Sequence, residues 1–261
     1  MKFRLLLLSL VIIFAVVPAF AQDDTHTLTY DGFSFTYDST VAANVNIVPF
    51  VGDDPANAMP GFSDAPYVQF LLYSTFPAPE SLFEVGGVRV YRLSDVAEYE
   101  FVADQVTELN TLLLSRPDLT TYMATTPNAN NFVLPFLPVL PSVQVIRARA
   151  NYVESDSISG ISYITVYRQD AFPFLANEFL YTFQGISAEY YVSAVFRVNA
   201  DLFPAEIPAD FSYDDFITNI QTYFADSIAA LNAATPADFT PSLDSLDAVI
   251  ASFTFTPEAS S

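Results

Sequence analysis

The amino-acid sequence predicts an α+β protein in which an antiparallel β-sheet is covered by amphipathic helices. Four consecutive segments of the second half are rich in β-branched and aromatic residues and are joined by short polar links, which is typical of an antiparallel meander. Two other segments carry apolar residues at spacings of three and four, which indicates helices with one buried side. Because strands and helices are grouped rather than alternating regularly, the pattern favours α+β over α/β.

The N-terminal residues have the features of a secretion signal. Lys2 and Arg4 precede a short apolar run over residues 5–17, and an Ala-Phe-Ala triplet then provides small residues at the positions that a signal peptidase recognises. We therefore expect a signal peptide over residues 1–21. An uncleaved membrane anchor is the alternative, but the run is short for a membrane span, which needs about 20 apolar residues.

Charge defines the surface that the exported chain would present. The full sequence has a formal net charge of −21, and residues 22–261 keep seven arginines against all 30 acidic residues, which gives −23. Such a surface repels the phosphates of nucleic acids and anionic lipid headgroups. We therefore expect neither nucleic-acid binding nor stable membrane association after signal cleavage.

The remaining composition indicates a folded domain outside the cytoplasm. A hydrophobic content of 52%, with 25 Phe and 15 Tyr, is too high for a disordered chain and sufficient for a large core. The absence of cysteine excludes disulfides, thiolate metal sites and lipid attachment through cysteine. No internal repeat or Gly/Ser-rich linker divides residues 22–261. We expect a single α+β domain that is secreted, periplasmic or on the cell surface, and not lipidated.

The first half of the chain is predicted to form a hairpin, two strands and a helix. Asp31 and Gly32 separate two alternating runs, and an Asp-Gly pair adopts positive φ at little cost, so a tight hairpin is expected. Strand-like runs follow at Tyr67–Tyr73 and at residues 85–93. The helix is expected to begin after a capping Asp95 and to end at the next Arg-Pro pair.

An apolar stretch at residues 132–141, interrupted by a proline at every third position, admits several interpretations. It is far too short to span a membrane. A polyproline II ligand usually lies in polar surroundings, whereas this stretch is flanked by apolar residues. The favoured interpretation is an extended segment lying across an open face or edge of the sheet, where it buries Phe136, Leu137 and Leu140.

The second half is predicted to contain the meander, a long helix and a closing strand. The meander strands are expected at residues 143–153, 158–169, 178–185 and 189–198. In the long helix, Ser212 is the expected cap, with Asp215 three residues on, and apolar residues from Phe216 and Ile217 onward trace its buried side. A short helix at residues 244–249 and a strand at residues 250–256 follow.

The order of these elements resembles the PsbP-like α/β sandwich. It is also similar to a family of functionally uncharacterised exported bacterial proteins. The closest matching residues are the opening hairpin at 30–37 and the closing LDAVIASFTF at 246–255. The resemblance spans most of residues 22–261 and implies a sheet sandwiched with helices, but it brings no catalytic motif, and a fold does not define a function.

Four of the seven arginines in residues 22–261 fall in the meander: Arg147, Arg149, Arg168 and Arg197. Arg147 and Arg149 are two residues apart, so a regular strand would place them on one face. One hypothesis is an anion-binding patch for a carboxylate, sulfate or phosphate group. The favoured alternative is pairing with carboxylates of the same region. The candidates for that pairing are Glu154, Asp156, Glu178 and Glu189.

Acidic pairs offer a second kind of candidate site. Asp53 and Asp54 lie in a polar loop, and Ca²⁺ prefers several carboxylate and carbonyl oxygens as ligands. The D-x-D-x-D-G spacing of a known calcium loop is absent.

Catalytic groups are scarce in the sequence. His26 is the sole histidine and lies close to the expected cleavage site, and no cysteine is present, so triads and His/Cys zinc sites lack their parts. We therefore predict no catalytic residue and no cofactor. The favoured function is a non-catalytic exported binding or interaction module whose partner is an unknown small ligand or an envelope protein. The alternatives are a carboxylate-dependent hydrolase acting on carbohydrate and an accessory envelope protein without a small ligand.

Overall fold

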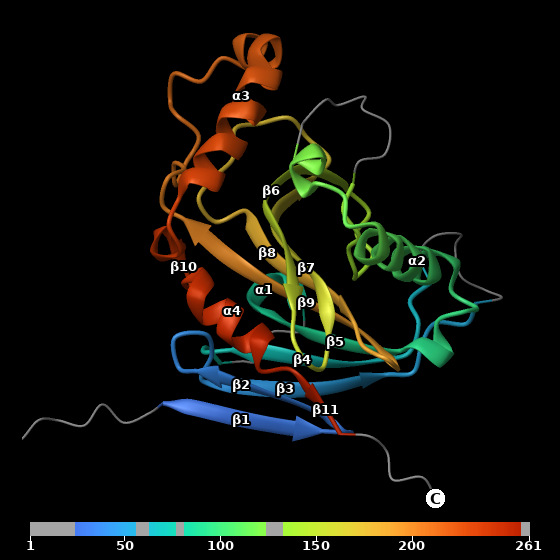
Figure 1. Ribbon diagram of the computed structural model, residues 1–261. Helices are drawn as coiled ribbons and strands as arrows, with labels where there is room; N and C mark the ends of the chain where they lie inside the picture. The colour runs from blue at the N-terminus through green and yellow to red at the C-terminus, as the bar shows by residue number, and fades with distance from the viewer. Residues whose placement is uncertain (1–23, 56–62, 77–80, 124–132, 257–261) are drawn as a thin grey trace, which may run out of the picture.

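The computed structural model describes residues 24–55, 63–76, 81–123 and 133–256. The signal peptide predicted at residues 1–21 lies outside these residues. Two antiparallel sheets and a small number of helices make up the described chain (Figure 1). The α+β class and the antiparallel pairing predicted from the sequence are therefore confirmed.

The larger sheet has the strand order β3-β4-β5-β9-β8-β7-β6, and every neighbouring pair is antiparallel. A short strand, β10, pairs with the end of β9. The strands are β3 (Asn44–Phe50), β4 (Tyr67–Tyr73), β5 (Gly86–Arg92), β6 (Val143–Glu154), β7 (Ser159–Arg168), β8 (Phe179–Ile186), β9 (Tyr190–Ala200) and β10 (Phe239–Thr240). The predicted meander is confirmed as β6 to β9. The sequence did not predict β3, an edge strand that contains Pro49, a residue typical of edges.

The smaller sheet contains β1 (Thr25–Tyr30), β2 (Phe33–Asp38) and β11 (Thr254–Phe255) in the order β1-β2-β11. Asp31 and Gly32 have φ angles of 48° and 78°, which confirms the predicted hairpin turn. The strand predicted at residues 250–256 is wrong in extent. The preceding helix continues to Ala251, because Leu246, Val249 and Ile250 are buried at the spacing of three and four that is typical of a helix.

The helices are α1 (Leu82–Val85), α2 (Glu100–Ser115), α3 (Tyr213–Ala233) and α4 (Leu243–Ala251), with short 3₁₀ turns η1 (Leu93–Asp95), η2 (Leu119–Tyr122) and η3 (Pro236–Asp238). The predicted cap of α3 is confirmed, since the Ser212 hydroxyl accepts from the backbone N–H of Asp215.

The predicted start of α2 is wrong. The helix begins at Glu100 rather than after Asp95. The residues between them form a turn that buries Val96 and Tyr99, and the Tyr99 hydroxyl donates to the carbonyl of Asp53. Tertiary contacts of these two side chains therefore override the capping signal in the sequence.

Two apolar cores lie on the opposite faces of the larger sheet. The alternation of β9 shows this directly, because Val192 and Ala194 belong to the first core whereas Tyr191 and Val195 belong to the second. The first core also contains buried side chains of β2, α4 and the C-terminal half of α3. The second core contains buried side chains of α2 and of the segment at residues 133–141.

The centre of the segment at residues 133–141 is buried against the larger sheet, which confirms the prediction for Phe136 and Leu137, whereas Leu140 is only half-buried. Leu134, Phe136 and Leu137 are between 0% and 4% exposed. The Gln184 side chain binds both the N–H and the carbonyl of Leu137, and the Gln144 side chain does the same for Leu134. These amide groups replace the hydrogen bonds that a neighbouring strand would supply to a buried backbone.

Candidate functional site

The structure does not bring the four arginines predicted as an anion patch together. Arg147 donates to the carbonyls of Tyr122 and Gln144 on the side of the second core. Arg149 donates to the carbonyls of Leu231 and Ala234 at the end of α3, on the side of the first core. The expectation that Arg147 and Arg149 share one face is therefore wrong.

A β-bulge explains this reversal of faces. The register of β6 and β7 shifts between Ala148 and Asn151, and Arg149 has a φ of 54° in the left-handed region. An extra residue in one strand changes which face the following side chains occupy. The sequence does not predict the bulge, because position 149 is an arginine rather than a glycine or asparagine, the residues that commonly adopt a positive φ.

Arg168 and Arg197 also have separate partners. Arg168 forms ion pairs with Glu178 and Asp170, and Glu178 is one of the carboxylates expected to pair in this region. Arg197 donates to the carbonyls of Phe83 and Asn177. The anion patch stays a prediction without a common surface for its four members.

The predicted calcium residues, Asp53 and Asp54, are both exposed. A carboxylate oxygen of Asp53 accepts from the backbone N–H of Asp64 at 2.7 Å. Within the described ranges, no group of three or more His, Cys, Asp or Glu side chains is placed to hold a metal ion. Calcium binding at Asp53 and Asp54 therefore stays a prediction.

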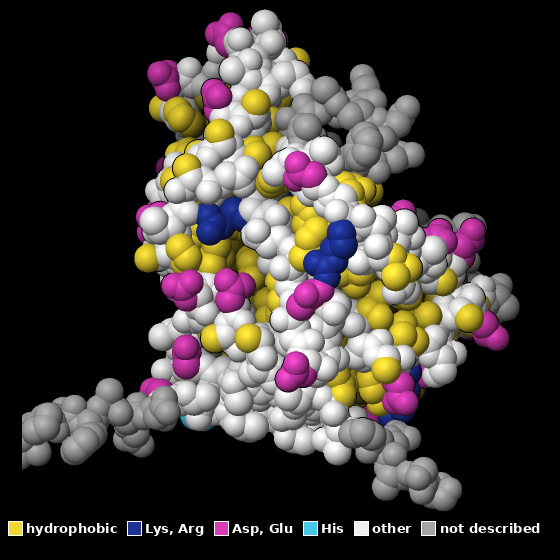
Figure 2. All heavy atoms as spheres, viewed as in Figure 1, with side chains coloured by type: hydrophobic (Ala, Val, Ile, Leu, Met, Phe, Trp, Pro, Cys, Tyr) yellow, Lys and Arg dark blue, Asp and Glu magenta, His cyan; other side chains and the backbone are white. Residues whose placement is uncertain are grey.

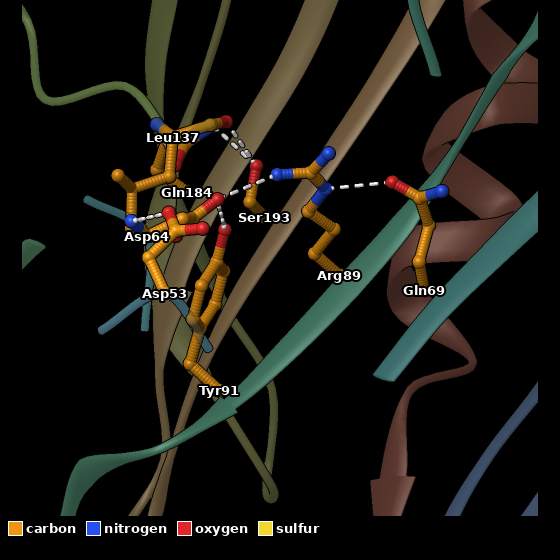
Figure 3. Close-up of polar contacts among 8 residues, drawn as sticks. All are labelled: Asp53, Asp64, Gln69, Arg89, Tyr91, Leu137, Gln184 and Ser193. Carbon is orange, nitrogen blue, oxygen red and sulfur yellow. Dashed lines mark hydrogen bonds and ion pairs between the residues drawn. The ribbon is translucent and has the colours of Figure 1, made fainter. Parts of the chain in front are cut away.

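A buried charged cluster that the sequence analysis missed lies beside Asp53 (Figure 3). Arg89 of β5 donates to Asp64 at 2.8 Å and to the side-chain oxygen of Gln69 at 2.7 Å. The side chains of Arg89 and Asp64 are only 13% and 14% exposed. The Arg89 guanidinium also lies 4.1 Å from the centre of the Tyr67 ring. The cluster anchors the base of the loop before β4 onto the sheet.

Asp64 is incompletely stabilised in this cluster. Its Oδ2 atom accepts from Arg89 and, at 3.4 Å, from the Tyr91 hydroxyl, whereas Oδ1 is buried without a hydrogen-bond partner among the described residues. Burial raises the pKa of Asp64 to about 6, although the positive charge of Arg89 acts to lower it. The cost of burying this carboxylate thus exceeds the attraction of its partner.

The raised pKa predicts a specific pH dependence of stability. Below about pH 4, Asp64 is protonated in both the folded and the unfolded chain. Above about pH 6 it is ionised in both, and the buried charge then destabilises the folded state relative to the unfolded state. As pH rises through this window, the free energy of unfolding of the parent should therefore fall by roughly 2 to 3 kcal/mol relative to that of Asp64→Asn. Urea unfolding at a series of pH values measures the difference.

A companion variant checks that Asp64 causes the effect. Removing the guanidinium in Arg89→Met should raise the pKa of Asp64 further, so that the loss of stability becomes larger and continues to higher pH. Parallel stability curves for the parent and Asp64→Asn between pH 4 and 7 would contradict the assignment.

One surface cavity of 280 Å³ is a further candidate. Asp156 and Glu189 lie on its rim, and Tyr190 and Phe255 form its apolar wall. The two rings already stack on each other at 4.8 Å, and the Arg92 guanidinium lies 5.5 Å from the centre of the Tyr190 ring. The apolar wall of the cavity therefore consists of rings that already pack on each other.

A group of exposed apolar side chains lies where α3 projects beyond the larger sheet (Figure 1). The C-terminal half of the helix is fixed in the first core through Phe224, Ile228 and Leu231. The first five residues of α3 and the end of the loop before it, residues 207–217, are called the α3 tip here. Three apolar side chains of the tip are 39% to 50% exposed: Ile207, Tyr213 and Ile217.

Aromatic contacts give the α3 tip a defined shape. Phe211 lies 5.6 Å from Phe216, and Tyr213 lies 5.6 Å from Phe172, as measured between ring centres. Phe216 and Tyr223 form an edge-on pair at 5.1 Å. Such pairs contribute about 1 kcal/mol each, so the exposed side chains rest on an ordered aromatic base.

The prediction that Ile217 lies on the buried side of the helix is wrong, and Phe216 is only half-buried. A helical period identifies which side of a helix is apolar, but it does not reveal where along its length the sheet ends. No pattern in the sequence marks the exposed half of α3. The charged cluster, in contrast, has a signal in the sequence, because Arg89 interrupts the apolar residues of β5.

Comparisons with known proteins do not assign the chain to a family. No protein-family model matches the sequence, and no curated protein matches it. In the part of the chain that the structure describes, no helix has the length and apolar content needed to cross a membrane.

Proposed function

We propose that this chain is an exported, non-catalytic interaction module that binds another protein through the α3 tip. One observation carries the proposal, namely that the first half of a 21-residue helix exposes Tyr213 and Ile217, whereas its second half packs into the first core. Contiguous exposed apolar side chains surrounded by polar residues are typical of protein-binding surfaces. Export rests on the signal peptide predicted at residues 1–21.

A single fluorescent label tests where binding occurs. The chain has no cysteine, so Ile217→Cys can be labelled at one position with an environment-sensitive dye. Leu114→Cys is the matched control, because Leu114 is 86% exposed on α2. Amphipathic helical peptides of positive, neutral and negative charge are titrated into both. A response at position 217 that position 114 lacks supports the proposal, and equal responses or none at 217 contradict it.

A second candidate function, a carboxylate-dependent hydrolase acting on carbohydrate, is favoured by one observation. Asp64 has a raised pKa and lies beside Asp53, and two neighbouring carboxylates are the groups that glycosidases use. The ion pair with Arg89 and the low exposure of Asp64 weigh against it. Glycoside hydrolysis that is lost in Asp64→Asn would establish it.

We further propose that the fold is a PsbP-like sandwich in which amphipathic helices cover the sheet. Support comes from Val102 and Leu109 of α2 in the second core and from Leu246 and Val249 of α4 in the first. An accessory role in the cell envelope is compatible with the same α3 tip, because it requires a protein partner and no small ligand.

A further inference from the structure

Carboxylates surround the apolar side chains of the α3 tip. Glu206, Asp210, Asp214 and Asp215 are all exposed. The sequence from residue 198 to its end contains no lysine, arginine or histidine. In Figure 2, magenta and yellow side chains lie over the upper part of the molecule, where α3 projects, and the blue side chains of that face lie below it.

The arginine at the base of the α3 tip is already engaged. Arg168 donates to the carbonyl of Phe172, whose ring supports Tyr213, but its guanidinium is paired with Glu178 and Asp170. The tip therefore combines an apolar centre with a negative rim. The positive end of the α3 dipole offsets part of this charge, but only within the first turn.

We propose that the α3 tip binds a basic amphipathic helix of a partner protein. The partner's apolar side chains would lie on Tyr213 and Ile217, and its lysines or arginines would lie beside the surrounding carboxylates. Complementary charge of this kind accelerates association and selects among partners with similar apolar faces. The inference rests on the proposed function, since it names the class of partner that the same surface takes.

Charge also separates this partner from the other possible occupants. A second copy of the chain would present the same carboxylates and, over residues 22–261, a net charge of −23, so that like charges would meet at the interface. Phosphate-rich surfaces, whether nucleic acid or anionic lipid, would be repelled for the same reason. An amphipathic helix in a complementary surface is a common mode of peptide recognition.

The probe is a short amphipathic helical peptide of leucine and lysine that carries one tryptophan. Because the chain itself has no tryptophan, the fluorescence of the peptide reports its own binding without interference. Two matched peptides carry glutamine or glutamate in place of lysine. We expect the lysine peptide to bind at least roughly tenfold more tightly than either, with an affinity that falls as salt is added.

Variants of the protein separate local from overall charge. Asp214→Asn with Asp215→Asn should weaken lysine-peptide binding several-fold. Glu100→Gln with Asp104→Asn removes the same charge from the start of α2, where both carboxylates are exposed, and should leave the affinity unchanged. Circular dichroism of each variant verifies that its helices remain folded.

The outcomes distinguish the inference from the proposed function. Preferential binding of the lysine peptide that depends on Asp214 and Asp215 supports both. Equal binding of the glutamine peptide, or equal losses in the two charge variants, overturns the basic partner and leaves the α3 tip as an apolar docking surface. Failure of every peptide to respond at a label on position 217 overturns both.

Discussion

Leu137→Asp is expected to lower the melting temperature by about 10 °C or more. Leu137 is 0% exposed and lies on the larger sheet in the second core, where the new carboxylate would find no water. Burying such a group without a partner costs more than about 4 kcal/mol, and each kcal/mol shifts the melting temperature of a chain of this size by roughly 2 to 4 °C. Thermal unfolding followed by circular dichroism measures the shift.

The same segment provides the control. Val133 is 45% exposed, so Val133→Asp should leave the melting temperature nearly unchanged. Should Leu137→Asp fail to fold, Leu137→Ala is expected to cost about 2 to 5 kcal/mol through the cavity it leaves. A melting temperature for Leu137→Asp equal to that of Val133→Asp would show that the segment is not buried.

Gln184→Leu is expected to lower the free energy of unfolding by about 3 to 5 kcal/mol, although leucine is similar in size to glutamine and more hydrophobic. Figure 3 shows Gln184 beside Leu137 and Ser193: its oxygen accepts from the N–H of Leu137, and its amide nitrogen donates to the Leu137 carbonyl and to Ser193. The Gln184 oxygen also accepts from the Tyr191 hydroxyl. Each buried polar group left without a partner costs roughly 1 to 3 kcal/mol. Equilibrium unfolding in urea gives the free energy.

Gln105→Leu is the matched comparison. Gln105 is half-buried and accepts one hydrogen bond, from the N–H of Phe136 at 2.8 Å. Its loss should therefore cost about 1 kcal/mol. If both glutamine variants cost the same, the network around Gln184 would have no special part in holding the segment.

Local patterns predicted much of the fold. The Asp31-Gly32 turn, the β6 to β9 meander and the Ser212 cap are each encoded within a few neighbouring residues, and all three are confirmed. The edge strand β3 was missed because its polar residues and Pro49 conceal the alternation of a strand. Pairing with β4 decides its conformation, and a sequence pattern does not report that partner.

Predictions that depended on distant contacts were less successful. The face of Arg149 depends on a bulge in β6, and the start of α2 depends on the burial of Val96 and Tyr99. The pairing of Asp64 with Arg89 joins residues 25 positions apart. The exposed half of α3 depends on where the larger sheet ends. Each of these features is set by the tertiary structure rather than by local sequence.

The central claim is that the α3 tip is kept for a partner rather than for folding. The most direct test compares the free energies of unfolding of two variants. The first is the double variant Tyr213→Ser/Ile217→Ser at the tip. The second is Phe224→Ala, at a buried position in the second half of α3. The double variant at the tip should lower the free energy of unfolding by no more than about 1 to 2 kcal/mol, and Phe224→Ala by about 3 to 5 kcal/mol. A double variant as costly as Phe224→Ala would show that the tip belongs to the core and would contradict the account.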